Sequence, residues 1–394
     1  MQIRDISCYR VALPLRRSIT HATMTRAESE SLVVACRLTN GIVGWGEGVP
    51  RSYVTGETPR TALDQLRATP LAEQLGRDCK HWPDVIAMCE GVELAPVADD
   101  PRGGAGNAAR CALELAILDA FGRHFGEPLS EVTKAYVAAR PIHEPRSRVR
   151  YSAAILSEGG ARESFNALAI RLYGFDQCKV KIGVAGDRDE RRLRTIRSFI
   201  GPRVDIRLDA NGVLTAANVR ERLEPLLQFS ISAIEQPIGH DEVDACAALR
   251  RDLGVKVMLD ESLVSIGDAR RAVEAGTCDL FNIRLSKCGG YLRSLQLAAI
   301  AHEAGLGYQL GCHPGESAIL SAAGRHWAAS VANIRYLEGS YDRYLNATPL
   351  IREDITFGYG GYAPALMGPG LGITVKEDMV RSLAADRIDI AVNA

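Results

Sequence analysis

Two hydrophobic patterns divide the first part of the chain. Up to about residue 60, apolar and polar residues alternate with the period of β-strands in IRDISCYRVAL, SLVVACRLTN and IVGWGEG, with a turn at Gly41. From about 60 to 140, apolar residues recur at helical spacing, as in ALDQLRATPLAEQL and ARCALELAILDAFGRHFG. We therefore expect an antiparallel meander followed by helices, which together form an α+β domain over residues 1–145.

A different pattern begins at about residue 146, where short β-rich runs alternate with amphipathic segments. The runs are VRYSAAI, QCKVKI, VDIRLD, ISAIEQ, KVMLDE, CDLFNIRL, LGYQLG and ANIRYLE. This alternation predicts a parallel (β/α) barrel over residues 146–356. An open doubly wound sheet is disfavoured because no Gly-rich phosphate loop follows the first run. The Gly-rich tail, 357–394, is expected to leave the barrel and pack back on the first domain.

Composition and charge narrow the classes of function. The 394 residues are 46% hydrophobic and 24% charged, and 47 Lys and Arg stand against 48 Asp and Glu. This balance gives no global field for nucleic acid or an anionic membrane, so a small molecule is the expected partner. The opening MQIRDISCYRVALPL lacks a long apolar run, and the ten cysteines include no CxxC pair. We expect a cytoplasmic protein with reduced, mostly buried cysteines.

Acidic residues end three successive β runs, at the place where a (β/α) barrel has its active site. Asp209 stands in IRLDAN, Glu235 in AIEQP and Asp260 in VMLDES. Three bare carboxylates from adjacent strands would repel one another unless a divalent cation lay between them. A ligand set of oxygen atoms without His or Cys favours Mg²⁺, with Mn²⁺ possible. The alternative is that each acid caps a helix, but three in register favour the metal site.

Two lysines in CKVKI, Lys179 and Lys181, are two residues apart, so their side chains point to the same face of a strand. On the inner face, burial and mutual repulsion would lower the pKa of Lys181 and make it a base near neutral pH. The alternative is an outward orientation. Val180 and Ile182 suit the helix-covered outer face better, so we expect the lysines inside.

A third lysine, Lys287, follows the sixth β run in RLSKCGG and should project from the wall opposite Lys181. A substrate held between the two could lose a proton on one face and regain it on the other, or cyclise. Glu261 could keep Lys287 charged through an ion pair. Taken alone, Lys287 would be a solvated loop lysine before Gly289 and Gly290.

The ordered motifs together resemble the enolase superfamily, and within it the muconate-cycloisomerase (muconate lactonizing enzyme) subgroup. KVK, DAN, EQP, DES and KCGG occur in the family's order over nearly the whole chain, and GWGEG with TGET looks like its capping domain. The resemblance implies a modified TIM-type barrel under an N-terminal α+β capping domain. It also implies Mg²⁺-dependent removal of the proton next to a substrate carboxylate, through an enediolate.

The resemblance further implies a role for each residue of the motifs. The metal ligands would be Asp209, Glu235 and Asp260, and the two acid/base groups Lys181 and Lys287. Lys179 would tune Lys181, Glu261 would orient Lys287, and Asn211 would bind substrate beside the metal site. One departure is His313 in GCHPGES, where the mandelate-racemase subgroup has a catalytic histidine. Its aspartate partner is missing from the sixth run, so the lysine-type subgroup fits better. His313 could still touch substrate, or cap the helix that starts near Gly315.

Specificity in this family is set at the end of the eighth strand and in two capping loops. Glu338 in RYLEGSY could bind a cationic or hydroxyl group, or merely pair with a neighbouring Arg or Lys. The polar segment 16–30 and the stretch PRSYVTGET look like the loops that close over substrate. Arg51, Tyr53 and Thr55 are therefore candidate substrate contacts.

Several reactions use the same parts. We place cycloisomerisation of a muconate-like diacid first, with a racemase or epimerase of an N-acyl amino acid or dipeptide, or a carboxylate dehydratase, as alternatives. The interpretation as a dipeptide epimerase is weakened because LEGSYDR lacks a paired acidic motif. Sugar-acid dehydration is weakened because the His–Asp dyad is missing. A protein that had lost catalysis and kept the fold for a binding or structural role would be expected to lack one of the metal-ligand residues or lysines, and none is missing. Members of the family often form homo-oligomers, so the resemblance implies a homo-oligomer here.

Overall fold

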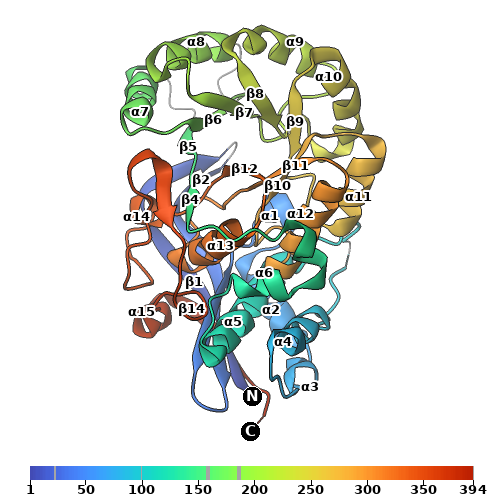
Figure 1. The fold of residues 1–394 in the computed structure, drawn as a ribbon, viewed down its shortest axis with the longest axis vertical. Helices are drawn as coiled ribbons and strands as arrows, with labels where there is room; N and C mark the ends of the chain where they lie inside the picture. Colours follow the sequence, from blue (N-terminus) through green and yellow to red (C-terminus); the bar gives the residue numbers. More distant parts are fainter. Residues whose placement is uncertain (22–23, 99, 157–159, 184–187, 394) are drawn as a thin grey trace.

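Three sheets organise the chain, which the computed structural model describes for residues 1–21, 24–98, 100–156, 160–183 and 188–393, with side chains outside 18–26. A four-stranded antiparallel sheet has the order β14-β1-β2-β3, an eight-stranded parallel sheet the order β12-β11-β10-β9-β8-β7-β6-β5, and β13 pairs with β4. The parallel sheet and its helices form one half of the molecule, and the antiparallel sheet with α2 to α5 forms the other (Figure 1).

The N-terminal unit comprises the first three strands and the helices that follow them. Its elements are β1 (Ile3–His21), β2 (Met24–Leu38), β3 (Val43–Gly48), α1 (Ser52–Thr55), α2 (Pro59–Ala68), α3 (Leu71–Leu75), α4 (Trp82–Glu90), α5 (Asn107–Phe125), α6 (Glu131–Ala135) and the 3₁₀ helix η1 (Val137–Ile142). The expected meander of three strands is confirmed by the antiparallel pairing of β1 with β2 and of β2 with β3.

The motif GWGEG in β3 is explained by the close approach of α5. A Cβ at Gly44, Gly46 or Gly48 would lie within 2.1 Å of backbone atoms of this helix, so only glycine fits on that face of the strand. The alternate residues face the other way. Glu47 accepts hydrogen bonds from Ser31 Oγ at 2.8 Å and from the amide of Ser317, which precedes helix α13 (Ala318–Ser330), at 3.0 Å.

The barrel contains every β run that the sequence predicted. Its strands are β5 (Ala153–Ile155), β6 (Gln177–Lys181), β7 (Asp205–Asp209), β8 (Ile231–Glu235), β9 (Lys256–Leu259), β10 (Leu280–Ile283), β11 (Gly307–Leu310) and β12 (Ile334–Leu337). Ser152 N donates to Leu337 O at 2.8 Å, which joins the two outer strands of the sheet. The predicted fold class, a (β/α) barrel with an N-terminal α+β unit, is confirmed.

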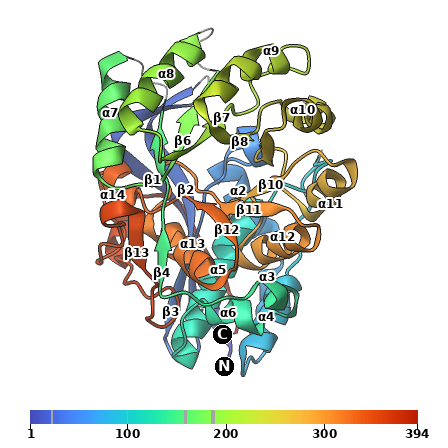
Figure 2. The same ribbon diagram turned by 45° about the horizontal axis from the view of Figure 1, so that its top comes forward.

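Helices cover the outside of the parallel strands (Figure 2). They are α7 (Gly160–Leu172), α8 (Asp189–Ile200), α9 (Val219–Leu223) with η3 (Glu224–Phe229), η4 (His240–Ala245) with α10 (Cys246–Leu253), α11 (Ile266–Ala275), α12 (Tyr291–Glu303) and α13 (Ala318–Ser330). The remaining elements are β4 (Arg148–Arg150), α14 (Asp342–Leu345), η5 (Tyr359–Gly361), β13 (Tyr362–Pro364), α15 (Glu377–Ser382) and β14 (Ala384–Ala391).

One expectation for the N-terminal half meets a different outcome, and the one for the tail is confirmed. The segment 16–30, expected as a capping loop, is largely a hairpin in which β1 and β2 continue to pair, with a register shift between Pro14 and Ile19. Backbone pairing does not require apolar alternation, so the polar sequence concealed it; the tip, 22–23, lies outside the described residues. The tail ends in β14, which pairs with β1, so it packs back on the N-terminal unit as expected. The domain limits at 145 and 357 stay a prediction.

The cysteines agree with the expectation from composition. All ten cysteines are free thiols, and every one except the half-buried Cys312 is buried. No helix in the part of the chain that the structure describes is long and apolar enough to cross a membrane.

Candidate active site

The interior of the barrel has an apolar floor with a polar layer above it. The floor is a small cluster of buried side chains formed by Ala233, Met258, Leu280 and Tyr336. Each is followed two residues later, on the same face of its strand, by one member of the polar layer: Glu235, Asp260, Asn282 and Glu338. The polar layer therefore lies on the same inner face as the apolar floor, two residues closer to the carboxyl ends of the strands.

The register of the strands brings the charged ends of β6, β7 and β8 side by side. Lys181 is paired with Asp209, and Asp209 with Glu235. Because side chains alternate, Lys179 lies on the same face as Lys181. Its contacts with acids of β7, β8 and β12 place that face inside the barrel, as the sequence indicated.

Lys179 is a permanent cation at the centre of the acids. Its Nζ lies 2.9 Å from Glu338 Oε1, 3.5 Å from Glu235 Oε1 and 3.5 Å from Asp209 Oδ2. Burial disfavours the ammonium, but the three carboxylates outweigh burial and hold the pKa of Lys179 above its ordinary value. Lys179 therefore stays charged and acts on Lys181 as a nearby positive charge.

Glu338 is neutralised by two cations. Besides Lys179 it accepts a hydrogen bond from Arg207 Nη2 at 2.5 Å, and the Arg207 guanidinium stacks 4.5 Å from the centre of the Tyr336 ring. Burial opposes ionisation, but Lys179 and Arg207 prevail and lower the pKa of Glu338 to about 2. Of the two alternatives for Glu338, pairing with a neighbouring Arg or Lys is the one that the structure contains.

The two candidate acid/base lysines differ in their surroundings. Lys181 is half-buried, and its pKa is lowered mainly by burial, which Asp209 opposes and Lys179 reinforces. Lys287 is fully buried, and burial lowers its pKa to about 8. Both can therefore exchange a proton nearer to neutral pH than an exposed lysine.

Lys287 is oriented by Asp260 and not by Glu261, which corrects our expectation. Its Nζ donates to Asp260 O at 2.7 Å, Asp260 Oδ1 at 2.9 Å and Asn282 O at 2.8 Å. Glu261 instead accepts from Asn211 Nδ2 at 3.1 Å. Asp260 and Glu261 lie in the bend and turn that follow β9, and of these two adjacent acids only Asp260 contacts Lys287.

The three proposed metal ligands are all buried at the barrel mouth. Asp209 Oδ1 accepts from the amide of Asn211 at 3.0 Å, and Glu235 Oε1 from Asn282 Nδ2 at 2.8 Å. Among the described residues no group of three or more acids, His or Cys is close enough to hold a metal ion as it stands. Ammonium and guanidinium groups lie between the acids.

The chemistry of this donor set nevertheless fits a hard divalent cation. The buried Glu235 Oε2 has no hydrogen-bond partner among the described residues, with Arg207 Nε 4.0 Å away. The ligands would be carboxylate oxygens from three adjacent strands, which is the set that Mg²⁺ prefers. Asp209, Glu235 and Asp260 as its ligands stay a prediction.

Three residues of the site, Arg207, Asn282 and Arg284, were missed from the sequence. Arg284 Nη2 forms an ion pair with Asp260 Oδ2 and lies 3.9 Å from Glu235 Oε1. The signal that could have found them is the period of two: Arg207 precedes Asp209 by two, and Asn282 precedes Arg284 by two, on inward faces.

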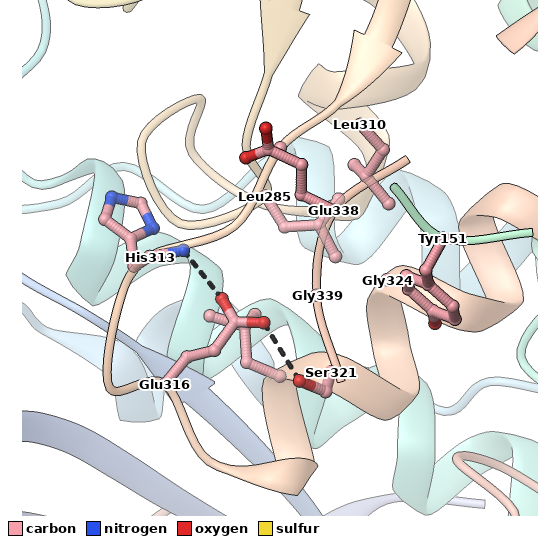
Figure 3. Close-up of a pocket in the computed structure, with 11 residues that line it drawn as sticks. Tyr151, Leu285, Leu310, His313, Glu316, Ser321, Gly324, Glu338 and Gly339 are labelled. Carbon is pink, nitrogen blue, oxygen red and sulfur yellow. Dashed lines mark hydrogen bonds between the residues drawn. The ribbon is translucent and has the colours of Figure 1, made fainter. Parts of the chain in front are cut away.

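His313 and Glu316 line a small pocket beside Glu338, after β11 (Figure 3). Glu316 accepts from the amide of His313 at 2.9 Å and from Ser321 Oγ at 3.0 Å. Burial, reinforced by the charges of Arg284 and Arg51, holds the pKa of His313 well below its ordinary value, so the imidazole is neutral. The side chain of Ser317 caps α13, so the alternative role of His313 as the cap is wrong. A contact of His313 with substrate stays a prediction.

The candidates from PRSYVTGET lie in different settings. The buried Arg51 donates from Nη1 to Glu30 O at 3.0 Å and from Nη2 to Ser29 Oγ at 2.8 Å, so it joins two parts of the N-terminal unit. Tyr53 is 44% exposed on α1, and Thr55 is buried. Their contacts with substrate stay predictions.

Comparison with known proteins finds two family matches that together span most of the chain. The family described as mandelate racemase/muconate lactonizing enzyme, N-terminal domain, matches residues 3–133, and the one described as enolase C-terminal domain-like matches residues 163–379.

Two similar proteins match this chain over nearly the full length of both sequences. N-succinyl-L-Arg/Lys racemase of Bacillus cereus is 28% identical over 385 residues, 97% of this chain and 98% of that one. Its crystal structure superposes with a TM-score of 0.85, covering 99% of this chain and 100% of that one at 25% identity. L-Lys-D/L-Arg epimerase of Methylococcus capsulatus is 31% identical over 393 residues, 96% of this chain and 100% of that one.

A third similar protein was solved with ligands. The dipeptide epimerase of Enterococcus faecalis V583, complexed with Mg and the dipeptide L-Leu-L-Tyr, has a TM-score of 0.80 at 25% identity, covering 95% of this chain and 100% of that one.

Proposed function

Because the chain belongs to the mandelate racemase/muconate lactonizing enzyme family of the enolase superfamily and is an isomerase by class, we propose that it is a Mg²⁺-dependent racemase or epimerase acting next to a substrate carboxylate. The observation that carries this proposal is the pair of lysines, Lys181 on β6 and Lys287 after β10. Their strands are four places apart in the eight-stranded sheet. A base on either side of one carbon can take a proton from one face and return one to the other.

The division of work between the lysines follows from their environments. Lys181, with its lowered pKa, has a neutral fraction that can accept the α-proton. Lys287, with a pKa of about 8, is mostly protonated at neutral pH and can deliver a proton to the opposite face. In the reverse direction the roles exchange. Lys179 remains charged and keeps the pKa of Lys181 low.

The cation would be held by Asp209, Glu235 and Asp260, with Asn211 and Glu261 beside it. When bound, Mg²⁺ supplies the positive charge that stabilises the second negative charge developing on the substrate carboxylate. The Mg in the Enterococcus faecalis dipeptide epimerase supports this choice. Mn²⁺ as a substitute stays a prediction, as does a homo-oligomeric state.

The ion pairs of Glu338 favour an amino acid whose nitrogen is blocked. A free substrate ammonium needs an acid to receive it, and Glu338 is already neutralised by Lys179 and Arg207. Burial raises the pKa of the neighbouring Glu316 to about 8, so that carboxyl is uncharged at neutral pH. We therefore propose an N-acylated amino acid as substrate, with a dipeptide second. The cycloisomerase that we placed first has less support, since the relatives named above are racemases and epimerases.

Incubation in D₂O with MgCl₂ tests the proposal directly. The probes are both enantiomers of a panel of N-succinyl and N-acetyl amino acids, together with dipeptides. We expect α-deuterium by mass spectrometry and loss of optical rotation for at least one N-acyl amino acid. A Lys181→Ala/Lys287→Ala double variant serves as the control. Absence of α-deuterium from every N-acyl amino acid and dipeptide would overturn the proposal.

A further inference from the structure

The turn that carries Lys287 is fastened to the N-terminal unit by four hydrogen bonds. The amide of Val49 donates to Ser286 Oγ at 2.7 Å, and Asn107 Nδ2 donates to Lys287 O at 2.6 Å. Glu114 Oε1 accepts from the amides of Tyr291 at 2.5 Å and Leu292 at 3.0 Å. These contacts hold the backbone on both sides of Lys287.

The glycines of KCGG make this attachment possible. A Cβ on Gly289 would lie 2.8 Å from Asn107 Oδ1, and one on Gly290 would lie 2.5 Å from Glu114 Oε1. Their φ angles are +85° and +114°, in the region that favours glycine. The two polar side chains of α5 therefore reach the turn only because it has no side chains at these positions.

Asn107 also connects Lys287 to the segment that follows Asp260. The same Nδ2 that bonds Lys287 O donates to Val264 O at 2.8 Å. Asp260 in turn accepts from Lys287 Nζ. One buried amide thus fixes the relative positions of two segments whose side chains meet at the site.

Glu114 acts on the other side of the turn, at the start of α12. Its carboxylate is buried, and it accepts two of the amides that the first turn of a helix leaves without partners. A carboxylate at a helix N-terminus is further stabilised by the helix dipole. The start of α12, and with it the end of the Lys287 turn, is therefore fixed to α5.

These backbone contacts matter because the side-chain contacts of Lys287 must change during a proton transfer. An ammonium donates three hydrogen bonds, to Asp260 and Asn282, and the neutral amine cannot keep them all. While Lys287 Nζ exchanges its proton, the position of this nitrogen therefore depends on where the backbone of the turn holds the Lys287 Cα.

We propose that Asn107 and Glu114 of α5 are positioning residues for Lys287. Through them the N-terminal unit fixes the position of the lysine that serves one face of the substrate carbon. The inference rests on the proposed function, in which Lys287 serves one enantiomer and Lys181 the other. Lys181 lies on β6, away from α5, so loss of the attachment affects the two faces unequally.

The test compares α-hydrogen exchange in D₂O for the separate enantiomers of each N-succinyl amino acid of the panel. Asn107→Ala and Glu114→Ala should slow exchange of the enantiomer served by Lys287 by about 10- to 100-fold relative to the other enantiomer. Glu114→Gln keeps an acceptor oxygen for the two amides and should restore most of the ratio. Thr69→Val is the matched control, because it removes the hydrogen bonds of a buried residue to Gln65 O and from the amide of Ala95 within the N-terminal unit, and none to the turn.

A second measurement needs no substrate. Acetylation by acetic anhydride at one fixed pH, followed lysine by lysine with mass spectrometry, should modify the buried Lys287 faster in Asn107→Ala than in the wild type, with Lys181 unchanged. Thr69→Val should leave the acetylation of both lysines as in the wild type.

Equal slowing of both enantiomers, or an unchanged Lys287 acetylation profile in Asn107→Ala, would overturn the inference. Wild-type protein that exchanges no enantiomer would overturn the proposed function instead, and the acetylation profile would then decide the inference by itself.

Discussion

Replacing Glu338 by Gln tests the charge balance inside the barrel. The carboxylate contacts Lys179 Nζ at 2.9 Å and Arg207 Nη2 at 2.5 Å, and its pKa is lowered from 4.5 to about 2. This difference, at about 1.4 kcal/mol for each pH unit, corresponds to about 3 kcal/mol of folding stability. Because the folded pKa lies below the unfolded one, the contribution is fully present above about pH 4.5 and is lost as the pH falls through about 2.

Urea unfolding of the wild type and Glu338→Gln, followed by circular dichroism, measures this contribution. We expect the variant to lose about 3 kcal/mol at pH 7 and the same at pH 5.5, with the gap narrowing below pH 4.5. Glu377→Gln is the matched control, because its partner Arg381 is exposed and such pairs contribute about 0.3–0.5 kcal/mol. A loss at pH 7 no larger than that of Glu377→Gln, or a gap that widens on acidification, would contradict the stabilisation of the ionised Glu338 by Lys179 and Arg207.

Three further perturbations have defined outcomes. MgCl₂ at about 100 times its Kd should stabilise the fold by about 2.7 kcal/mol in thermal unfolding, and Glu235→Gln should remove most of this gain; an equal gain in the variant would contradict the metal site. Gly46→Ala should cost about 1–3 kcal/mol in urea unfolding because its Cβ would lie 2.1 Å from Ala112 O, whereas an unchanged midpoint would contradict the close packing of α5. Burial raises the pKa of Glu316 from 4.5 to about 8, so between these pH values the folded protein keeps a proton that the unfolded chain has released. The free energy of unfolding of the wild type, relative to that of Glu316→Gln, should therefore fall by about 1.4 kcal/mol for each pH unit between 4.5 and 8. Unfolding free energies of the two proteins that run parallel with pH would contradict this.

Much of the fold could be predicted because it follows from local pattern. The β-rich runs after residue 146 each contain a strand of the barrel, and the two-residue spacing of Lys179 and Lys181 placed both on the inner face. The same spacing, applied to DIRLD and FNIRL, would have added Arg207 and Arg284 to the site. The period of the strand is a property of the backbone, so the sequence alone reveals it.

The pairing of side chains within the site could not be predicted in the same way. Lys287 is paired with Asp260 and not with its neighbour Glu261, because both acids lie in the bend and turn after β9, where the regular alternation of a strand no longer fixes side-chain direction. Glu338 is neutralised by cations from two other strands, and that depends on the closure of the barrel. The bonds of Asn107 and Glu114 to the Lys287 turn join segments that are more than 170 positions apart along the chain.

Complementary exchange by the two single lysine variants tests whether Lys181 and Lys287 serve opposite faces of the substrate carbon. Each enantiomer of an N-acyl amino acid that the wild type racemises is incubated in D₂O with Lys181→Ala or with Lys287→Ala. We expect that neither variant racemises, and that each still exchanges the α-hydrogen of one enantiomer, a different one for each variant. Exchange of both enantiomers by either variant, or racemisation at the wild-type rate by one of them, would contradict a reaction with one lysine on each face.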